Sequence, residues 1–544
     1  MPLSAIGRRA FAFFTTTILN FVLLAAGWMG ASEAEKLAGK GGIDGPACRE
    51  TTVVILGAGV AGITAAQALT NHSVTDFLIV EYNDYVGGRV AHTEFGARNE
   101  TFTVELGANW VQGLGSPGGP ENPIWTLAKK YNVTNTYSNY SDILTYDETG
   151  ASDYSDLLDD FEGAYATLEQ DAGYILSQNL QDRSTRAGLS LAAWKPRDTK
   201  KQAVEWWNWD WEYAYPPEES SQEFGVVNYN TTFYQYSEAN NYVFDQRGFN
   251  AFIQGEASTF LTEDDPRLLL NTRVTNITYK PSSINIQTHD GTCVQASYAI
   301  CTFSLGVLQN DEVTFEPSLP SWKRDAVDIF QMGTYTKIFL QFPYVFWPRD
   351  TQFFLYADPS TRGYYPVWQS LDAPGFLPGS GIIFVTVVDQ QAYRAERMSD
   401  AAVQAEVLQV LYRMFGQDNV PEPTAFMFPR WSSTPWAYGS YSNWPPGMTL
   451  EMHQNLRANI GGSLWFAGEA TSAEYFGFLH GAYFEGQEVG TKVAVCVRDG
   501  GAGSAECRAS QEVRYEVLHG TTQPEEYRSQ NGWMVSSFQT IGDV

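Results

Sequence analysis

The stretch Val53-Val-Ile-Leu-Gly-Ala-Gly-Val-Ala-Gly62 combines a strand, a glycine-rich turn and the start of a helix. Its β-branched run is typical of a strand that is buried on both faces. Gly57 permits a tight turn, Gly59 lets the backbone approach a pyrophosphate, and Gly62 lets the helix pack against the sheet. The N-terminus of that helix would offer free N–H groups to phosphate. The pattern predicts a dinucleotide-binding βαβ unit.

A second strand and a carboxylate complete this unit. The apolar run Phe77-Leu-Ile-Val80 ends on Glu81, about twenty residues past the last glycine of the turn. A carboxylate at this place can accept hydrogen bonds from ribose hydroxyls, and it excludes a phosphate on the same ribose. The basic motif Gly87-Gly88-Arg89 follows. We therefore expect the dinucleotide to be FAD.

Length and charge limit the function classes. With 544 residues the chain is long enough for two or more domains with sizeable cores. The formal net charge of −28 disfavours nucleic acid as a partner and would concentrate cationic ligands near an acidic cleft. An acidic surface that merely keeps the protein soluble is the alternative interpretation. The negative net charge is evidence for a cationic ligand only if the binding site itself favours a cation.

The N-terminal segment resembles a targeting sequence. Arg8 and Arg9 precede a largely apolar stretch, and small residues stand at Gly30, Ala31 and Ala34, where a signal peptidase could cut. We expect residues 1–34 to be a signal peptide and the protein to be secreted, with an uncleaved membrane anchor as the alternative. Six N-x-S/T sequons agree with secretion, at Asn71, Asn99, Asn132, Asn139, Asn230 and Asn276.

The cysteines and histidines predict no metal site. Five cysteines lack any C-x-x-C spacing, and six histidines are scattered along the chain. Cys301 lies in an apolar run and is expected to be a buried thiol. In an oxidising compartment a disulfide is expected among Cys48, Cys496 and Cys507, but the sequence does not choose the pair.

Strand and helix patterns along the chain predict two interleaved domains. We expect an α/β fold, with a doubly wound, Rossmann-like FAD-binding domain and an interleaved α+β substrate-binding domain. The predicted FAD-binding segments are 48–130, 240–330 and 455–498, and the predicted substrate-binding segments are 131–239 and 331–454. Residues 499–544 are Gly/Ser-rich and polar, which predicts a loose tail.

A final strand-turn-helix repeats the logic of the first motif. The strand Leu464-Trp-Phe-Ala-Gly-Glu469 delivers a carboxylate, and a helix is expected to begin near Gly481. The positive end of that helix would be directed at a ligand.

Lys337 lies on a predicted core strand. Between residues 334 and 342, Tyr335, Lys337, Phe339 and Gln341 share one face. A buried lysine between aromatic residues is costly unless it has a function. A lysine whose amine reaches solvent is the alternative.

Together these segments resemble the flavin-containing amine oxidases, and most closely their secreted polyamine oxidase branch. The likeness spans roughly residues 51 to 497. Beyond the first motif it rests on segments that keep the family order: Glu105-Leu-Gly-Ala-Asn-Trp110, Tyr335-Thr-Lys337, Tyr441-Ser-Asn-Trp444 and Phe466-Ala-Gly-Glu469.

The resemblance implies roles for the residues that would hold FAD. Glu81 would bind the adenosine ribose, Arg89 the pyrophosphate, and Val274 the adenine through its backbone. Glu469 would bind the ribityl-pyrophosphate region. Small or flat residues would line the flavin, namely Gly107, Ala108 and Trp110, and the helix that includes Gly481 and Ala482 would stabilise negative charge on its reduced ring.

The resemblance also implies the amine site. Lys337 would hold a water against flavin N5 and assist the reaction with oxygen. Tyr441 and Phe478 would face each other in front of the flavin and confine the amine, with Phe478 in place of an expected tyrosine. Gln112 stands where close polyamine oxidases carry a glutamate, which weakens one source of selectivity for polycations. Glu212 matches a second acidic position and could compensate, or it could be a solvated charge.

The implied reaction is oxidation of a polyamine of the spermine or spermidine class at a carbon–nitrogen bond. A hydride equivalent would pass to flavin N5, the imine would be hydrolysed, and O2 would be reduced to H2O2. An oxidase of L-amino acids or of other amines, on the same fold, is one alternative. A secreted flavoprotein that binds amines without turnover is another.

Overall fold

Strand β1 (Arg49–Leu56), helix α1 (Val60–Asn71) and strand β2 (Phe77–Val80) form the predicted βαβ unit. The computed structural model describes residues 48–97, 100–501, 503–511 and 513–523. β1 pairs in parallel with β2, and the residues from Val53 to Leu56 are fully buried. Burial on both faces explains why this run is uniformly apolar.

The first large sheet brings β1, near the start of the described chain, next to the same strand as β22, from its C-terminal part. Its strand order is β10-β2-β1-β13-β12-β11-β14, and β22 also pairs with β13. Leu56 of β1 and Phe466 of β22 are both in register with Cys301 of β13. The turns that follow β1 and β22 therefore open at the same edge, where α/β sheets bind ligands. The further strands are β10 (Leu268–Leu269), β11 (Val274–Lys280), β12 (Ser283–Thr288), β13 (Cys293–Cys301), β14 (Thr314–Glu316) and β22 (Leu464–Phe466).

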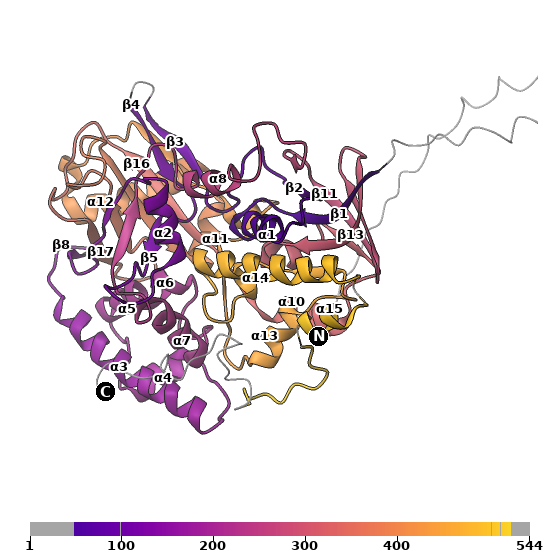
Figure 1. Cartoon of the computed structure of the whole chain (residues 1–544). Helices are drawn as coiled ribbons and strands as arrows, with labels where there is room; N and C mark the ends of the chain where they lie inside the picture. The colour runs from indigo at the N-terminus through magenta and orange to yellow at the C-terminus, as the bar shows by residue number, and fades with distance from the viewer. Residues whose placement is uncertain (1–47, 98–99, 502, 512, 524–544) are drawn as a thin grey trace, which may run out of the picture. The chain divides into compact units, whose positions relative to one another are not determined.

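Helix α14 (Leu479–Arg498) packs directly against α1, and the two ribbons run side by side in Figure 1. The contact depends on glycines. A Cβ on Gly486 would lie 2.2 Å from the carbonyl oxygen of Ala61, and one on Gly490 would lie 2.6 Å from that of Ala65. These distances allow no side chain, so the close packing fixes α14 relative to the nucleotide motif.

A second large sheet carries Lys337. Its order is β20-β16-β19-β18-β17-β7-β8. Ile338 and Leu340 of β16 share an apolar core with residues of α12, whereas Phe339 packs with Phe95 in another core, so the strand has the two faces predicted. The elements are β7 (Ile143–Asp147), β8 (Gly150–Ala151), β16 (Tyr335–Gln341), β17 (Phe353–Ala357), β18 (Val367–Ser370), β19 (Ile382–Val388), β20 (Ala425–Met427), α11 (Asp389–Glu396) and α12 (Asp400–Phe415).

Smaller sheets and helices complete the fold, including a π-helix in the aromatic block (Trp206–Asp210). The strands are β3 (His92–Ala97), β4 (Glu100–Glu105), β5 (Trp110–Gln112), β6 (Asn135–Tyr137), β9 (Asn240–Val243), β15 (Gln331–Gly333) and β21 (Tyr441–Asn443). The helices are α2 (Pro123–Lys130), α3 (Asp156–Ser177), α4 (Thr185–Leu191), α5 (Thr199–Glu205), α6 (Trp211–Tyr213), α7 (Gln222–Phe233), α8 (Ala251–Ala257), α9 (Leu305–Gln309), α10 (Ser321–Ile329), α13 (Leu450–Arg457) and α15 (Ala505–Ser510). The predicted α/β architecture is confirmed.

The cysteine prediction was incomplete. Cys496 pairs with Cys507, as one of the expected combinations, but Cys48 pairs with Cys293, which the sequence had not placed in a disulfide. Arg49 of β1 lies opposite Val294 of β13, so the residues just before them are neighbours. Cys301 is a buried free thiol, as predicted.

Part of the predicted loose tail is built into the fold. The Cys496–Cys507 disulfide ties α15 to α14, and residues beyond α15 contact α13. The Tyr515 N–H donates to Oδ1 of Asn455 (2.8 Å), and the Leu450 N–H donates to Oγ1 of Thr522 (3.3 Å). Residues 524–544 lie outside the described chain.

The sequons differ in accessibility. Asn71, Asn132 and Asn139 are exposed, whereas Asn230 is 1% exposed inside α7 and cannot carry a glycan in this fold. Asn99 and the predicted leader (residues 1–34) lie outside the described residues. Within the described chain, no helix is both long enough and apolar enough to cross a bilayer.

Candidate active site

One cavity joins the two nucleotide motifs. It is lined by residues of the first motif, such as Gly57, Glu81 and Arg89, and by Gly468 and Glu469 of the last. The same cavity continues to Lys337 and to a group of aromatic side chains. The structure therefore assembles the predicted cofactor and amine sites around one space.

The glycine-rich turn has the shape that a pyrophosphate needs. Gly57 has a φ of +111°, which side chains rarely adopt, and a Cβ on Gly62 would lie 2.0 Å from the Gly57 carbonyl oxygen. Gly59 and Gly57 line the cavity, whereas Gly62 serves the packing of α1. Gly59 caps α1, and no side chain satisfies the first N–H groups of this helix. The turn is thus a backbone cradle that fits the phosphates of FAD.

Glu81 closes this cradle from the end of β2. Its Oε2 accepts a hydrogen bond from the Ala58 N–H (2.6 Å), and its Oε1 accepts one from the Asn83 N–H (2.8 Å). Burial raises the pKa of the Glu81 carboxyl group, and these backbone N–H groups oppose the shift. The side chain is therefore held against the turn and lines the cavity at the place predicted for the ribose.

Arg89 and Glu469, 380 residues apart in the sequence, form an ion pair at 3.1 Å. Arg89 also donates to the carbonyl oxygen of Ser440 (2.9 Å). Oε1 of Glu469 accepts hydrogen bonds from the N–H groups of Ser442 (2.7 Å) and Gly477 (2.8 Å). This ion pair connects the first and last nucleotide motifs, as expected if both motifs bind the same nucleotide.

The segment with the predicted flavin-lining residues packs against the backbone of Arg89. A Cβ on Gly107 would lie 1.8 Å from the Arg89 carbonyl oxygen, so only glycine fits there. Ala108 and Trp110 also line the cavity. Trp110 is held edge-on between Trp211 (5.4 Å between ring centroids) and Tyr242 (5.3 Å). An aromatic side chain held in this way, beside small residues, can pack against a flat ring system.

Lys337 is buried beside that wall, with 1% of its surface exposed. Its Nζ donates to the carbonyl oxygens of Glu105 (2.9 Å) and Gly107 (2.6 Å) and to Oδ1 of Asn109 (2.7 Å). Burial lowers the pKa of this amine, and the Glu105 carboxyl group opposes the shift. Burial contradicts the alternative of an amine that reaches solvent, and the three acceptors fix Nζ at the cavity wall.

Aromatic side chains form the amine end of the cavity. Tyr441 and Phe478 both line it, and Tyr335 lies 5.9 Å from Tyr441 between ring centroids. The Tyr441 hydroxyl donates to the carbonyl oxygen of Glu212 (2.7 Å). Phe478 stacks on His480 at 5.1 Å. Both predicted walls are therefore fixed by neighbours.

Gln112 and Glu212 meet in the same cavity. Nε2 of Gln112 donates to Oε1 of Glu212 at 3.4 Å, a long hydrogen bond. Burial raises the pKa of the Glu212 carboxyl group to about 7, and the Gln112 amide opposes the shift. The alternative that Glu212 is a solvated charge near a proline turn is wrong. The amide at Gln112 leaves Glu212 as the single acidic group of this pair.

The remaining predicted cofactor residues divide into those that line the cavity and one that serves helix packing. Val274 and Ala482 line the cavity. Gly481 is not among the lining residues; a Cβ there would lie 2.3 Å from the Tyr475 carbonyl oxygen, so it serves packing. α14 begins at Leu479, two residues before the predicted start, and no side-chain cap occupies its N–H groups.

Sequence reasoning missed several lining residues. Asn228, Trp431, Trp436 and Tyr140 come from segments with no recognisable motif, whereas Tyr213 comes from the aromatic-rich block. The unusual density of tryptophan and tyrosine between residues 206 and 215 was the available signal for Tyr213. No group of three or more metal-ligating side chains occurs among the described residues.

Comparisons with known proteins agree with this site. Residues 60–494 match the family model of flavin containing amine oxidoreductases. Polyamine oxidase 1 of Zea mays is 36% identical over 463 residues, which cover 80% of this chain and 88% of that protein. Polyamine oxidase 7 of Oryza sativa subsp. japonica is also 36% identical, over 80% of this chain and 93% of that protein.

A solved structure supports the fold. Putrescine oxidase bound to putrescine has a TM-score of 0.63 with 17% identity, and the likeness covers 82% of this chain and 99% of that one. The family match runs from Val60, at the start of α1, past Lys337 and through the last nucleotide motif. The chain belongs to the flavin-containing amine oxidoreductase family, and its cofactor is FAD.

Proposed function

We propose that this FAD-dependent amine oxidase acts on polyamines of the spermine and spermidine class, at a carbon–nitrogen bond. The observation that carries the proposal is the Glu212 carboxyl group, which lines the same cavity as Lys337 and can attract a distal ammonium. The formal net charge of −28 would enrich such cations around the protein. The similarity to the Zea mays and Oryza sativa polyamine oxidases supports this substrate class.

The side chains of the cavity prepare the amine for oxidation. The apolar walls of Tyr441 and Phe478 disfavour a charged amine between them, so the reacting nitrogen enters in its neutral form. Glu212 holds the far end of the substrate, and Lys337 binds a water at the cavity wall when that water replaces one of its three oxygen acceptors. When bound, FAD supplies a hydride acceptor that O2 reoxidises with release of H2O2, and the imine product hydrolyses in water.

The arginines of the cavity argue against an L-amino-acid oxidase. Such a site needs an arginine that is free to bind the substrate carboxylate. Along the described part of the cavity, Arg89 pairs with Glu469, and Arg273 pairs with Glu312. Both guanidinium groups are therefore engaged in the nucleotide half of the site.

Anaerobic mixing of the purified protein with single amines tests the proposal. Spermine, spermidine, their acetylated forms and a panel of L-amino acids are compared by the loss of oxidised-flavin absorbance. We expect bleaching with the polyamines and none with the amino acids. Bleaching by amino acids alone, or by no compound, would overturn the proposed substrate class.

Glu212→Gln is expected to raise KM for spermidine about tenfold or more, because a charge-assisted contact contributes about 1.5–3 kcal/mol. The pH profile should change as well. In the wild type the carboxyl group, with a pKa of about 7, is neutral below that pH and charged above it. The value of kcat/KM for spermidine should therefore rise as pH increases through about 7, and this limb should vanish in the variant.

Glu219→Gln is the matched control, because it removes the same charge from a nearby exposed residue that does not line the cavity. It should keep the wild-type KM and pH profile. A Glu212→Gln enzyme with an unchanged profile would remove Glu212 from substrate recognition.

We further propose that the protein is secreted. The leader-like residues 1–34, the exposed sequons at Asn71, Asn132 and Asn139, and two disulfides fit an oxidising secretory route. Expression in a eukaryotic cell should release protein into the medium, with a mass that falls after glycosidase treatment. Retention in the cytosol without glycan would contradict this.

A further inference from the structure

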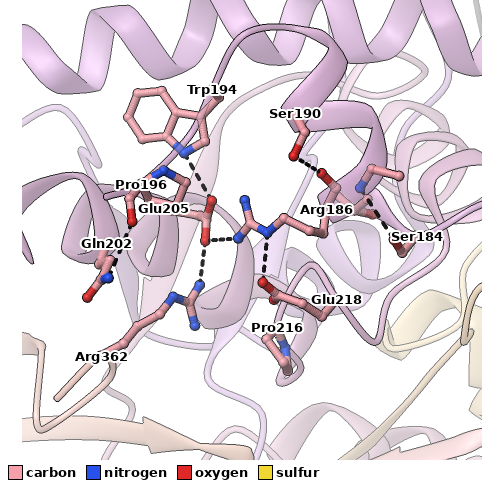
Figure 2. Close-up of polar contacts among 12 residues, drawn as sticks. Ser184, Arg186, Ser190, Trp194, Pro196, Gln202, Glu205, Pro216, Glu218 and Arg362 are labelled. Carbon is pink, nitrogen blue, oxygen red and sulfur yellow. Dashed lines mark hydrogen bonds and ion pairs between the residues drawn. The ribbon is translucent and has the colours of Figure 1, made fainter. Parts of the chain in front are cut away.

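A network of charged side chains surrounds Glu205, which is fully buried at the end of α5 (Figure 2). Its carboxylate accepts hydrogen bonds from Nε1 of Trp194 (3.0 Å) and from Nη2 of Arg362 (2.9 Å), and it pairs with Arg186. Arg186 in turn donates through Nε to Glu218 (2.7 Å). Two guanidinium groups thus converge on one buried carboxylate.

Arg362 extends this network to the π-helix that follows α5. Its Nη1 and Nη2 bind the two carboxylate oxygens of Asp210 at 2.6 and 2.7 Å, a bidentate contact. Asp210 is the last residue of the π-helix and is 3% exposed. A planar fork bound to both oxygens fixes orientation as well as distance.

Arg362 belongs to the connection between β17 and β18, and this connection presses on the same π-helix. Gly363 has a φ of +76°, and a Cβ there would lie 2.9 Å from Nε1 of Trp206. Loop backbone and helix are therefore in direct contact. The ion pair sits where the second sheet meets the π-helix.

The π-helix leads directly into the amine end of the cavity. Trp211, Glu212 and Tyr213 follow Asp210, and all three line the cavity. The three residues form the single turn α6, which begins directly after Asp210, so a shift of Asp210 would also shift this turn. The segment ends at Ala214, which has a φ of +57°. Anchoring Asp210 therefore sets where the Glu212 carboxylate lies.

We propose that Arg362 is a positioning residue for amine recognition, which locks the π-helix through Asp210 and Glu205 so that Glu212 faces the substrate. This inference rests on the proposed function of Glu212. Arg362 is not among the residues that line the cavity, so any effect on the amine acts through its neighbours. A buried ion network is weak evidence for net stability, so fixing one arrangement of the π-helix is the role that this inference assigns to it.

Arg362→Lys keeps the positive charge but cannot form the bidentate contact, and Arg362→Gln removes the charge as well. In both variants we expect KM for spermidine to rise about tenfold, because a small displacement of a binding group has effects of this size or larger. The binding of hexylamine, which has one nitrogen and needs no partner at Glu212, should stay within about twofold. The flavin spectrum and the rate of flavin reduction at saturating spermidine should not change.

Arg413→Gln is the matched control. It breaks the ion pair between Arg413 and Asp358 (3.2 Å), and Asp358 lies in the same β17–β18 connection as Arg362. This ion pair includes no residue of the π-helix. The control should bind spermidine like the wild type. If Arg362→Gln does not fold, Arg362→Lys carries the test.

A double variant separates positioning from general stability. In a Glu212→Gln background, adding Arg362→Lys should leave KM for spermidine unchanged, since the group that Arg362 places is already gone. Additive losses, or a single variant with wild-type KM, would overturn the inference. Failure of the wild type to bleach with spermidine would instead overturn the proposed function.

Discussion

Replacing Lys337 with methionine will leave the protein yellow and able to accept electrons from substrate, but reoxidation by O2 will slow about 100-fold or more, the usual effect of removing a positioned proton-transfer group. Methionine has a similar length and lacks the amine. In the wild type, three oxygens hold Nζ at the cavity wall next to Gly107 and Ala108. The measurement is stopped-flow mixing of the reduced enzyme with oxygenated buffer.

The reductive step serves as the internal control. Lys337 also ties together the backbone at Glu105 and Gly107, so a general disturbance would slow reduction and release FAD. We expect the FAD content and the anaerobic reduction rate to stay near wild type. If the rate constant with O2 is the same in both proteins, the role assigned to Lys337 is refuted.

The nucleotide unit could be predicted from the sequence because its constraints are local. Gly57 needs its φ of +111°, and Gly62 leaves no room for a Cβ, so these residues mark the turn wherever the rest of the chain lies. Glu81 follows the same logic, because the end of β2 adjoins the end of β1 in any parallel pair. Lys337 was found by the period of two along β16, which is also local.

The features that escaped prediction depend on tertiary neighbours. Cys293 pairs with Cys48 only because β1 and β13 lie in parallel with this register. Asn230 matches a sequon, yet α7 is buried along most of its length. Glu212 lines the cavity from a turn that follows a π-helix, and no propensity in the aromatic block distinguishes a π-helix from an α-helix.

The second large effect is expected at Glu81. Glu81→Ala should weaken FAD binding about 100-fold or more, because two effects combine: the ribose loses its carboxylate acceptor, and the Ala58 N–H loses its partner at 2.6 Å. Both effects act on the free energy of FAD binding, since the glycine turn must keep its shape to hold the pyrophosphate. Purified protein should be nearly colourless, and titration with FAD by fluorescence quenching should give the affinity.

Asp76→Ala is the control for Glu81→Ala, because it removes a carboxylate at a strand end and leaves the nucleotide site intact. Asp76 lies at the opposite end of the same strands, where Oδ2 accepts a hydrogen bond from the Thr52 N–H at 2.9 Å, and it does not line the cavity. This variant should stay yellow and bind FAD as the wild type does. A fully yellow Glu81→Ala protein would contradict the ribose assignment. Equal loss of FAD in both variants would mean that the sheet edge, and not the carboxylate at the cradle, controls cofactor affinity.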